Sequence, residues 1–518
     1  MSRIFQNILI LLFAGGLVCL PGRSYSQIFN VSAPGKEPAL PVLMDSVANG
    51  FNLYDFSANS AALPEDEREF SLDLKSFVFY ENGDYRRVLQ PSQINHQYFI
   101  SEMVKPLSER NIFKGNFGYT RQLDFDQAWL HQNRLREENP FILGDNSSGL
   151  FKSNGLFWMA EWARKFNPQF SGGLRLDYLV DQRLRQTFPK PENRHRDMQV
   201  KVSGIYRLSR WKLGGWLKYL DNQEKVIITK YNLDQNLTPV LYKFLFAGLP
   251  QILEGKTSEE RLIEYSGPQA SAQLQSAFSE NWQYMLEFNI MKTSGKVEDG
   301  GSQPVSQGKF DHEGYRLKFN NRLRPAPFWS MDVGFSFTNQ VIEYYHPDYD
   351  ITLGCRQFTT REIVVANGIR IRPGIHLYID GTLSWQEAEF SERALPLYFD
   401  QKWLMPQIRT GLSFPVAGRL RAQTWWSGFL LSGYKETIRG NADDAFTTPV
   451  LLDRADYFKI FNKSWNSGAE LIYRYGPMWD LRFRLQAGQF LAKNTTHLIS
   501  GKKRTHIFLQ VSIKFYII

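Results

Sequence analysis

A two-residue alternation of apolar and polar side chains constrains the fold of this chain more than any other feature. In the segment 504–518, every second residue from Ile507 to Ile517 is apolar, and Gln510, Ser512 and Lys514 lie between them. Successive side chains of a β-strand point to opposite faces, so this pattern predicts a strand with one apolar face. Lipid can cover such a face without any further protein.

The same pattern recurs in sixteen segments, most of which have the ~9–12 residues that a tilted strand needs to cross a bilayer. They are 112–123, 155–166, 170–181, 197–208, 211–221, 269–278, 282–293, 312–323, 328–340, 361–371, 374–388, 403–414, 418–431, 467–474, 479–490 and 504–518. Tight turns, such as Pro373-Gly374, alternate with long polar loops. This alternation is typical of outer-membrane barrels. The predicted fold class is therefore all-β: a transmembrane antiparallel β-barrel of about 16 strands, within a range of roughly 14 to 18.

Tryptophan placement supports this prediction. Trp211, Trp282, Trp329 and Trp479 each follow a tight turn and belong to the apolar alternation of their segment. A belt of aromatic side chains at a membrane boundary would produce this placement. The alternative is a soluble β-sandwich, which also alternates but has no reason to place Trp at the short-turn ends.

The chain divides into three predicted parts. Residues 1–26 have a basic start, an apolar run and small residues before Gln27, which indicates a secretory signal peptide. We expect residues 27–110 to form a short periplasmic or plug-like segment, with 70–88 compatible with one hairpin. Residues 111–518 would form the barrel, with 504–518 closing against 112–123. The predicted location is the outer membrane of a Gram-negative cell.

The polar faces of the strands predict a charged lumen. Arg or Lys on the lipid face near the midplane costs ~2–4 kcal/mol each, so the polar set must point inward. Eleven basic residues of this set are candidate binding residues: Arg175, Lys201, Arg207, Lys218, Arg316, Lys318, Arg409, Arg421, Arg474, Arg482 and Arg484. Acids on the same faces, such as Glu287 and Asp480, are fewer. Rings of Arg and Lys favour anions. The alternative is a network of Arg and acids that stiffens a plugged barrel.

Two loop features are candidate sites. The sequence EYYHPDYD places Glu343, His346, Asp348 and Asp350 in one outer loop, where they are candidates for a hard-metal or sugar site; a solvated polar loop is the plainer interpretation. The loop 222–268 contains the apolar stretch VLYKFLFAGLPQIL, 240–253. It either folds into the lumen as a constriction or contacts a partner.

Two short motifs resemble an uncharacterised family of outer-membrane barrels from the Bacteroidota. They are NPFILGDNSSG, 139–149, and FPKPENRHRDMQVKVSGIYRLS, 188–209. The resemblance implies the fold and the location, and it implies a possible partner because members are often encoded near TonB-dependent receptors. It implies no activity. From the residues alone, turn formers such as Asn139-Pro140 and Asp145 fix the shape of a loop.

These observations lead to a main functional hypothesis and two alternatives. The main one is a channel or transport-accessory barrel for small, anionic solutes. The first alternative is a non-conducting binding subunit of a larger complex with a TonB-dependent receptor or another outer-membrane subunit. The second is a barrel hydrolase, although no catalytic motif is recognised, so no enzyme is predicted. Membrane lipid is the expected partner, and no cofactor, metal or nucleic acid is expected. A net charge of +9 over 518 residues is mild.

Overall fold

The computed structural model describes most of the chain after residue 52. The described ranges are 53–66, 70–132, 139, 141–229, 241–246, 249–253, 258–279, 281–349, 351–393, 397–439, 453–497 and 499–517. The predicted signal peptide, 1–26, lies outside them. Within these ranges, no helix combines the length and the hydropathy needed to span a bilayer.

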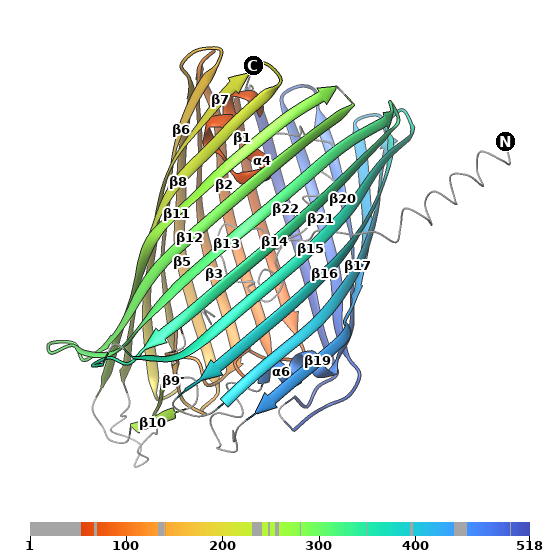
Figure 1. Cartoon of the computed structure of the whole chain (residues 1–518). Helices are drawn as coiled ribbons and strands as arrows, with labels where there is room; N and C mark the ends of the chain where they lie inside the picture. The colour runs from red at the N-terminus through yellow and green to blue at the C-terminus, as the bar shows by residue number, and fades with distance from the viewer. Residues whose placement is uncertain are drawn as a thin grey trace.

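A closed antiparallel β-barrel forms the body of the molecule (Figure 1). Its wall strands are β1 (Phe70–Asn82), β2 (Gln93–Ser108), β3 (Asn111–Gln127), β5 (Gly149–Lys165), β6 (Phe170–Arg185), β7 (Lys190–Leu208), β8 (Trp211–Thr229), β11 (Glu259–Ser279), β12 (Trp282–Asp299), β13 (Val305–Ala326), β14 (Trp329–Tyr345), β15 (Thr352–Arg372), β16 (Ile375–Glu392), β17 (Leu397–Ala417), β18 (Leu420–Leu430), β19 (Ser432–Arg439), β20 (Phe461–Tyr475), β21 (Trp479–Ala492) and β22 (Lys503–Ile517). Both β18 and β19 pair with β17, so the nineteen strands of the sheet occupy eighteen wall positions.

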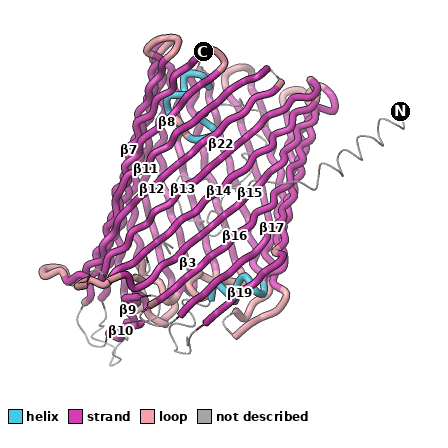
Figure 2. The backbone as a smooth tube through the Cα atoms, in the orientation of Figure 1, coloured by secondary structure: helices cyan, strands magenta, loops and turns pink. Residues whose placement is uncertain are grey.

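The sixteen predicted segments each coincide with one of these wall positions, so the fold class is confirmed. Short turns lie at one end of the barrel, and the long loops lie at the other end (Figure 2). The wall strands extend beyond the predicted segments mainly at the long-loop end. For example, the predicted segment 312–323 is part of β13, which begins at Val305. The predicted count of 16 was slightly low, because the wall has 18 positions.

The two missing strands correct the predicted barrel boundary. Residues 70–108 are not a separate segment, because β1 pairs with β22 on one side and with β2 on the other. The predicted closure of 504–518 against 112–123 is therefore wrong: β1 and β2 lie between them. The physical reason is that β1 and β2 carry aromatic residues on the inner face. Phe77, Phe79 and Tyr98 are buried there, so both faces are apolar and the alternation is lost.

The outer face of the wall is apolar. Leu217 and Val202 are 68% and 56% exposed, and they lie on outward positions of β8 and β7. The wall strands expose many large Leu, Ile, Val and aromatic side chains, which is the surface expected to face acyl chains. The four predicted belt tryptophans are the first residues of β8, β12, β14 and β21.

The long-loop end is covered by two packed layers. A small sheet joins β4 (Leu143–Gly144) of the first long loop to β9 (Leu241–Phe246), which pairs with β10 (Leu249–Leu253). Leu241 is buried with Leu143 against the inner face of β8. The second layer is α6 (Asp453–Ile460), where Tyr457 stacks on Tyr85 at 4.4 Å between ring centroids. Within the apolar stretch 240–253, the side chains that the structure describes, 241–243, are therefore buried inside the protein.

An antiparallel barrel closes only with an even number of wall strands, and this gives a test of the assignment of β1 to the wall. Deleting residues 70–92 removes β1 and leaves β22 beside β2, which runs in the same direction, so the antiparallel seam cannot form. We expect this variant to lose the heat-modifiable, compact migration of a folded barrel on a denaturing gel. Deleting residues 53–66 removes no wall strand and should preserve that migration. Compact migration of both variants would contradict the assignment of β1 to the wall.

Candidate functional site

A short helical segment lies inside the barrel at the short-turn end. It consists of α4 (Leu53–Ser57), the 3-10 turn η1 (Ser60–Ala62) and α5 (Leu63–Asp66), and we call it the plug segment, 53–66 (Figures 1 and 2). Asn59 caps η1, because its side chain accepts a hydrogen bond from the Ala61 amide. The segment approaches the wall closely at Gly173, where a Cβ atom would lie 2.7 Å from Ser60 and Ala61. Glycine is therefore required for this contact.

Polar wall groups bind the plug segment from several strands. The Asn59 amide donates to Gln273 Oε1 of β11 at 2.7 Å, and the Ala61 amide donates to Ser203 Oγ of β7 at 3.1 Å. The Tyr54 hydroxyl donates to Glu161 of β5 at 2.9 Å. Small apolar clusters complete the contact; for example, Leu63 packs among residues of β2, β3 and β5.

Basic wall residues contact the oxygen atoms of the plug segment. Lys201 Nζ donates to the Ala58 carbonyl, and Lys318 Nζ donates to the Phe56 carbonyl at 3.0 Å. The Glu65 carboxylate accepts from Arg207 Nε at 2.6 Å and from Lys212 Nζ at 2.5 Å. Burial alone would raise the pKa of Glu65, but Lys212 and Arg207 hold it below the ordinary value. Glu65 is thus a carboxylate at neutral pH.

The structure places basic residues next to one another on this part of the wall. Lys201 of β7 lies directly opposite Arg175 of β6 and Lys218 of β8. Arg175 forms a two-bond ion pair with Asp177, at 2.7 and 2.8 Å, and Lys218 donates to Gln199 at 3.4 Å. Like charges in directly opposite positions are destabilising unless anionic groups lie nearby. This row is the most concentrated basic part of the predicted set.

The remaining predicted basic residues have acidic or hydroxyl neighbours. Arg316 faces the carboxylates of Glu287 and Glu362. The other five contacts are Arg409 with Asp380 at 3.8 Å, Arg421 with Ser413 at 2.8 Å, Arg474 with Asp480 at 2.9 Å, Arg482 with Asp480 at 3.7 Å, and Arg484 with Glu470 at 3.2 Å. These contacts match the stiffening network that the sequence left open as an alternative.

The predicted outer-loop residues do not converge on one point. Glu343 accepts a hydrogen bond from Tyr345, whereas His346 Nδ1 accepts from the Asp348 amide. Asp350 lies outside the described residues. Among the side chains that the structure describes, no group of three or more His, Cys, Asp or Glu residues is arranged to hold a metal ion.

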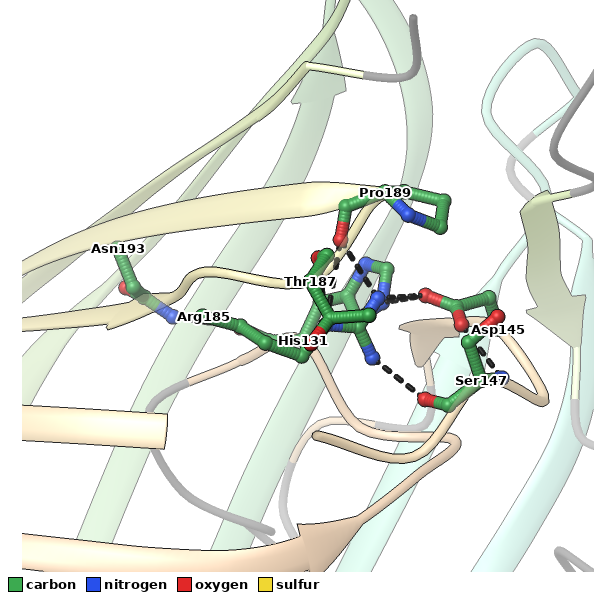
Figure 3. Close-up of polar contacts among 7 residues, drawn as sticks. All are labelled: His131, Asp145, Ser147, Arg185, Thr187, Pro189 and Asn193. Atoms are coloured by element: carbon green, nitrogen blue, oxygen red, sulfur yellow. Dashed lines mark hydrogen bonds and ion pairs between the residues drawn. The ribbon is translucent and has the colours of Figure 1, made fainter. Parts of the chain in front are cut away.

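Sequence reasoning missed a buried polar cluster that joins the two family-like motifs (Figure 3). Asp145 of the first long loop is bound by His131 Nε2 and, at 2.5 Å, by Arg185 of β6. Arg185 also donates to the Ser147 carbonyl at 2.6 Å and to the Pro189 carbonyl at 2.6 Å. We call these five residues the loop clamp. The two motifs were the only sequence signal for this cluster, because Asp145 lies in 139–149 and Pro189 lies in 188–209.

Electrostatics keep the loop clamp in one charge state. Burial would raise the pKa of Asp145, but His131 and Arg185 lower it to about 2. Burial lowers the pKa of His131, and Arg185 and Arg183 lower it further, against the opposing effect of Asp145. The clamp is therefore a neutral imidazole beside a carboxylate–guanidinium pair. The side chains of His131 and Asp145 are 0% and 1% exposed. The pair is therefore enclosed, and a substrate cannot reach it.

The closed wall, its apolar outer face and its charged lumen with an internal plug define a transmembrane β-barrel of the outer-membrane type. The chain belongs to the family of unknown function DUF6850, which matches residues 68–516. The expected membership of an uncharacterised family is thus confirmed, whereas the phylum and the neighbouring receptor gene stay predictions. No protein of curated function matches.

Several solved outer-membrane structures are similar in outline. The outer membrane transporter YddB from Escherichia coli has a TM-score of 0.43 and 7% identity, and the match covers 87% of this chain and 81% of that one. The ferric yersiniabactin uptake receptor FyuA from Yersinia pestis has a TM-score of 0.44 and 7% identity, covering 88% and 81%. The siderophore receptor PiuA from Acinetobacter baumannii has a TM-score of 0.42 and 7% identity, covering 86% and 82%. At these values the similarity assigns no ligand and no residue role.

The loop clamp predicts how acid affects the first long loop. Both titrating groups have folded pKa values below their unfolded values of 6.5 and 3.8, so both stabilise the fold at higher pH and lose that contribution as pH falls. We expect hydrogen exchange of residues 141–148, corrected for intrinsic rates, to be constant at pH 7–8. Protection should fall below about pH 6.5, and again between about pH 4 and 2. His131→Gln should remove the upper step and keep the lower one; an unchanged upper step would contradict the role of His131.

Proposed function

We propose that this protein is a gated transport barrel of the outer membrane that passes small anionic solutes, with the plug segment 53–66 as its gate. The main support is the position of the plug segment inside the lumen, bound by side chains of β5, β7, β8, β11 and β13. A segment in this place obstructs the passage while it is bound. Transport then requires the plug segment to move away from the wall.

The chemistry of the contacts supports a movable gate. Among its described contacts with basic wall groups, the plug segment presents backbone carbonyls and the Glu65 carboxylate. Water can replace such hydrogen bonds to charged groups at a net cost of about 1.5–3 kcal/mol each. Its apolar contacts involve few side chains, such as Leu53 and Leu63. The plug segment contributes no strand to the wall, since β1 begins after it, at Phe70. The segment can therefore leave its site while the barrel remains closed at the β1–β22 seam.

The preference for anions rests on the wall. Lys201, Lys318, Arg207 and Lys212 all direct their charged groups at the plug segment, which offers Glu65 as the carboxylate in return. When the plug segment leaves, these groups face the passage. Rings of basic side chains favour anionic solutes.

The two alternatives receive less support from the described residues. Docking on a receptor complex was motivated by the apolar stretch 240–253, but Leu241 and Tyr242 are buried against the first long loop and the wall. A hydrolase needs reactive groups that a substrate can reach. The His131–Asp145 pair is enclosed, and its carboxylate is bound to Arg185.

Crosslinking tests the gate directly. In planar bilayers, the variant Asn59→Ala/Glu65→Gln should conduct more often than the wild type, because it removes two plug contacts. A crosslink between Ala61→Cys and Ser203→Cys, in a Cys355→Ser background, should abolish the conductance, and reduction should restore it. The Ala61 amide lies 3.1 Å from Ser203 Oγ, so a short link does not move the segment. The matched control Asp221→Asn removes a carboxylate from an exposed pair with Arg196 and should conduct like the wild type. Equal conductance of crosslinked and reduced protein would contradict the gate.

Ion selectivity tests the preference for anions. Reversing two lumenal charges, with Arg316→Glu and Arg482→Glu, should shift the reversal potential of the open variant toward cations in a salt gradient. Salt screens charges that face water, so this shift should weaken at high salt. An unchanged reversal potential would show that these arginines do not face the conducting path.

A further inference from the structure

The inner face of the β7–β8 hairpin carries basic residues in directly opposite pairs. Arg207 lies opposite Lys212 near the turn, and Lys201 lies opposite Lys218 deeper in the lumen. Two cations at one cross-strand position repel each other, so each pair is stable only with a compensating anion or dipole. Both pairs meet oxygen atoms of the plug segment, Glu65 at the first pair and the Ala58 carbonyl at the second.

The first pair has the geometry of an oxyanion site. Arg207 Nε and Lys212 Nζ bind separate oxygens of the Glu65 carboxylate, at 2.6 and 2.5 Å. A further nitrogen, Arg207 Nη1, is buried without a hydrogen-bond partner among the described residues. A planar guanidinium beside an ammonium group is the combination that binds carboxylates and phosphates, and the unused nitrogen can bind an additional oxygen.

We propose that Arg207 and Lys212 form an anion-binding site for solutes that carry a phosphate or carboxylate group, and that Glu65 is a tethered occupant that such a solute displaces. This inference rests on the proposed gate and adds the ligand that opens it. An oxyanion that binds between Arg207 and Lys212 removes the ion pairs of α5 and so releases one end of the plug segment. Binding of the anion and release of the plug segment thus occur at the same residues.

The second pair extends the site into a path. Lys201 lies six residues from Arg207 along β7, a separation of ~20 Å, so one small anion cannot occupy both pairs. The second pair faces the Ala58 carbonyl, which leaves with the plug segment. A solute released from the first pair then meets Lys201, Lys218 and the adjacent Arg175. Two successive cationic positions on one hairpin give an anion a stepwise route.

Binding of inorganic phosphate to the purified full-length protein in detergent tests the first site without any transport measurement. Titration calorimetry would compare sodium phosphate with sodium chloride at equal ionic strength and pH 7.5. Glu65→Gln removes the tethered competitor, so its Kd for phosphate should be about tenfold lower than that of the wild type. The triple variant Glu65→Gln/Arg207→Gln/Lys212→Gln should lose this binding. Asp221→Asn makes the same charge change on the outward-facing wall and should bind phosphate like the wild type.

A second measurement keeps Glu65 in place and reports its displacement. Ala62 is fully buried in the plug segment, so Ala62→Cys in a Cys355→Ser background should react slowly with a water-soluble maleimide. Phosphate should accelerate the reaction, and chloride at equal ionic strength should not. The proposal is overturned if Glu65→Gln binds phosphate no tighter than Asp221→Asn, or if phosphate leaves the labelling rate unchanged. Either result would leave the gate to be tested by its conductance. A barrel that binds phosphate at this site but never conducts would overturn the transport role and keep the anion site.

Discussion

The fold depends on one constraint: backbone N–H and C=O groups within a bilayer must all be paired inside the protein. A sheet meets this condition only by closing on itself, and here the closure is the β1–β22 pairing over residues 70–82 and 505–517. Once the ring is closed, side chains must alternate between hydrocarbon and the interior. The apolar outer face at Leu217 and the charged inner face at Lys218 are consequences of this one requirement.

Closure also creates a problem inside the barrel. Alternation places every second side chain in the lumen, and on neighbouring strands this brings cations together, as at Arg175, Lys201 and Lys218. Part of this charge is balanced within the wall, for example by Asp177 beside Arg175. The plug segment adds compensation, because the Ala58 carbonyl accepts from Lys201 and the Glu65 carboxylate accepts from Arg207. The plug segment is therefore an electrostatic component of the barrel as well as an obstruction.

The sequence predicts the strands that have lipid on one face and a polar interior on the other. All sixteen segments with one apolar face are wall strands, because hydrocarbon on one side and water on the other leaves a two-residue period. β1 and β2 were missed because Phe77, Phe79 and Tyr98 make their inner faces apolar too, so the pattern loses its contrast. The strands also proved longer than predicted. Toward the long loops the outward positions become charged, as at Glu264 and Lys296, yet the hydrogen-bonded ladder continues.

The candidate site was only partly predictable for a related reason. Alternation assigns a side chain to the inner face, and this placed Lys201, Arg207 and Lys318 in the lumen. It does not say what faces them, because the partner comes from residues 53–66, more than a hundred positions earlier in the chain. Lys212 was missed because only the register of β7 and β8 places it opposite Arg207. The loop clamp was missed because its contacts join the first long loop to the end of β6 and to the connection between β6 and β7.

The described residues at the two ends of the barrel are held by different kinds of interaction, and in the proposed mechanism this asymmetry determines which end opens first. At the long-loop end, α6 and neighbouring strands pack an extended aromatic core that includes Tyr85, Tyr457 and Phe461, and the loop clamp adds a buried ion pair. Separating such a core exposes apolar area at about 25 cal/mol per Å², and breaking a buried ion pair costs about 3–5 kcal/mol. At the short-turn end, most contacts are hydrogen bonds that water or a solute anion can replace. The plug segment is therefore held by the contacts that are easier to replace, and in the proposed mechanism an anion that reaches Arg207 acts at this end of the barrel.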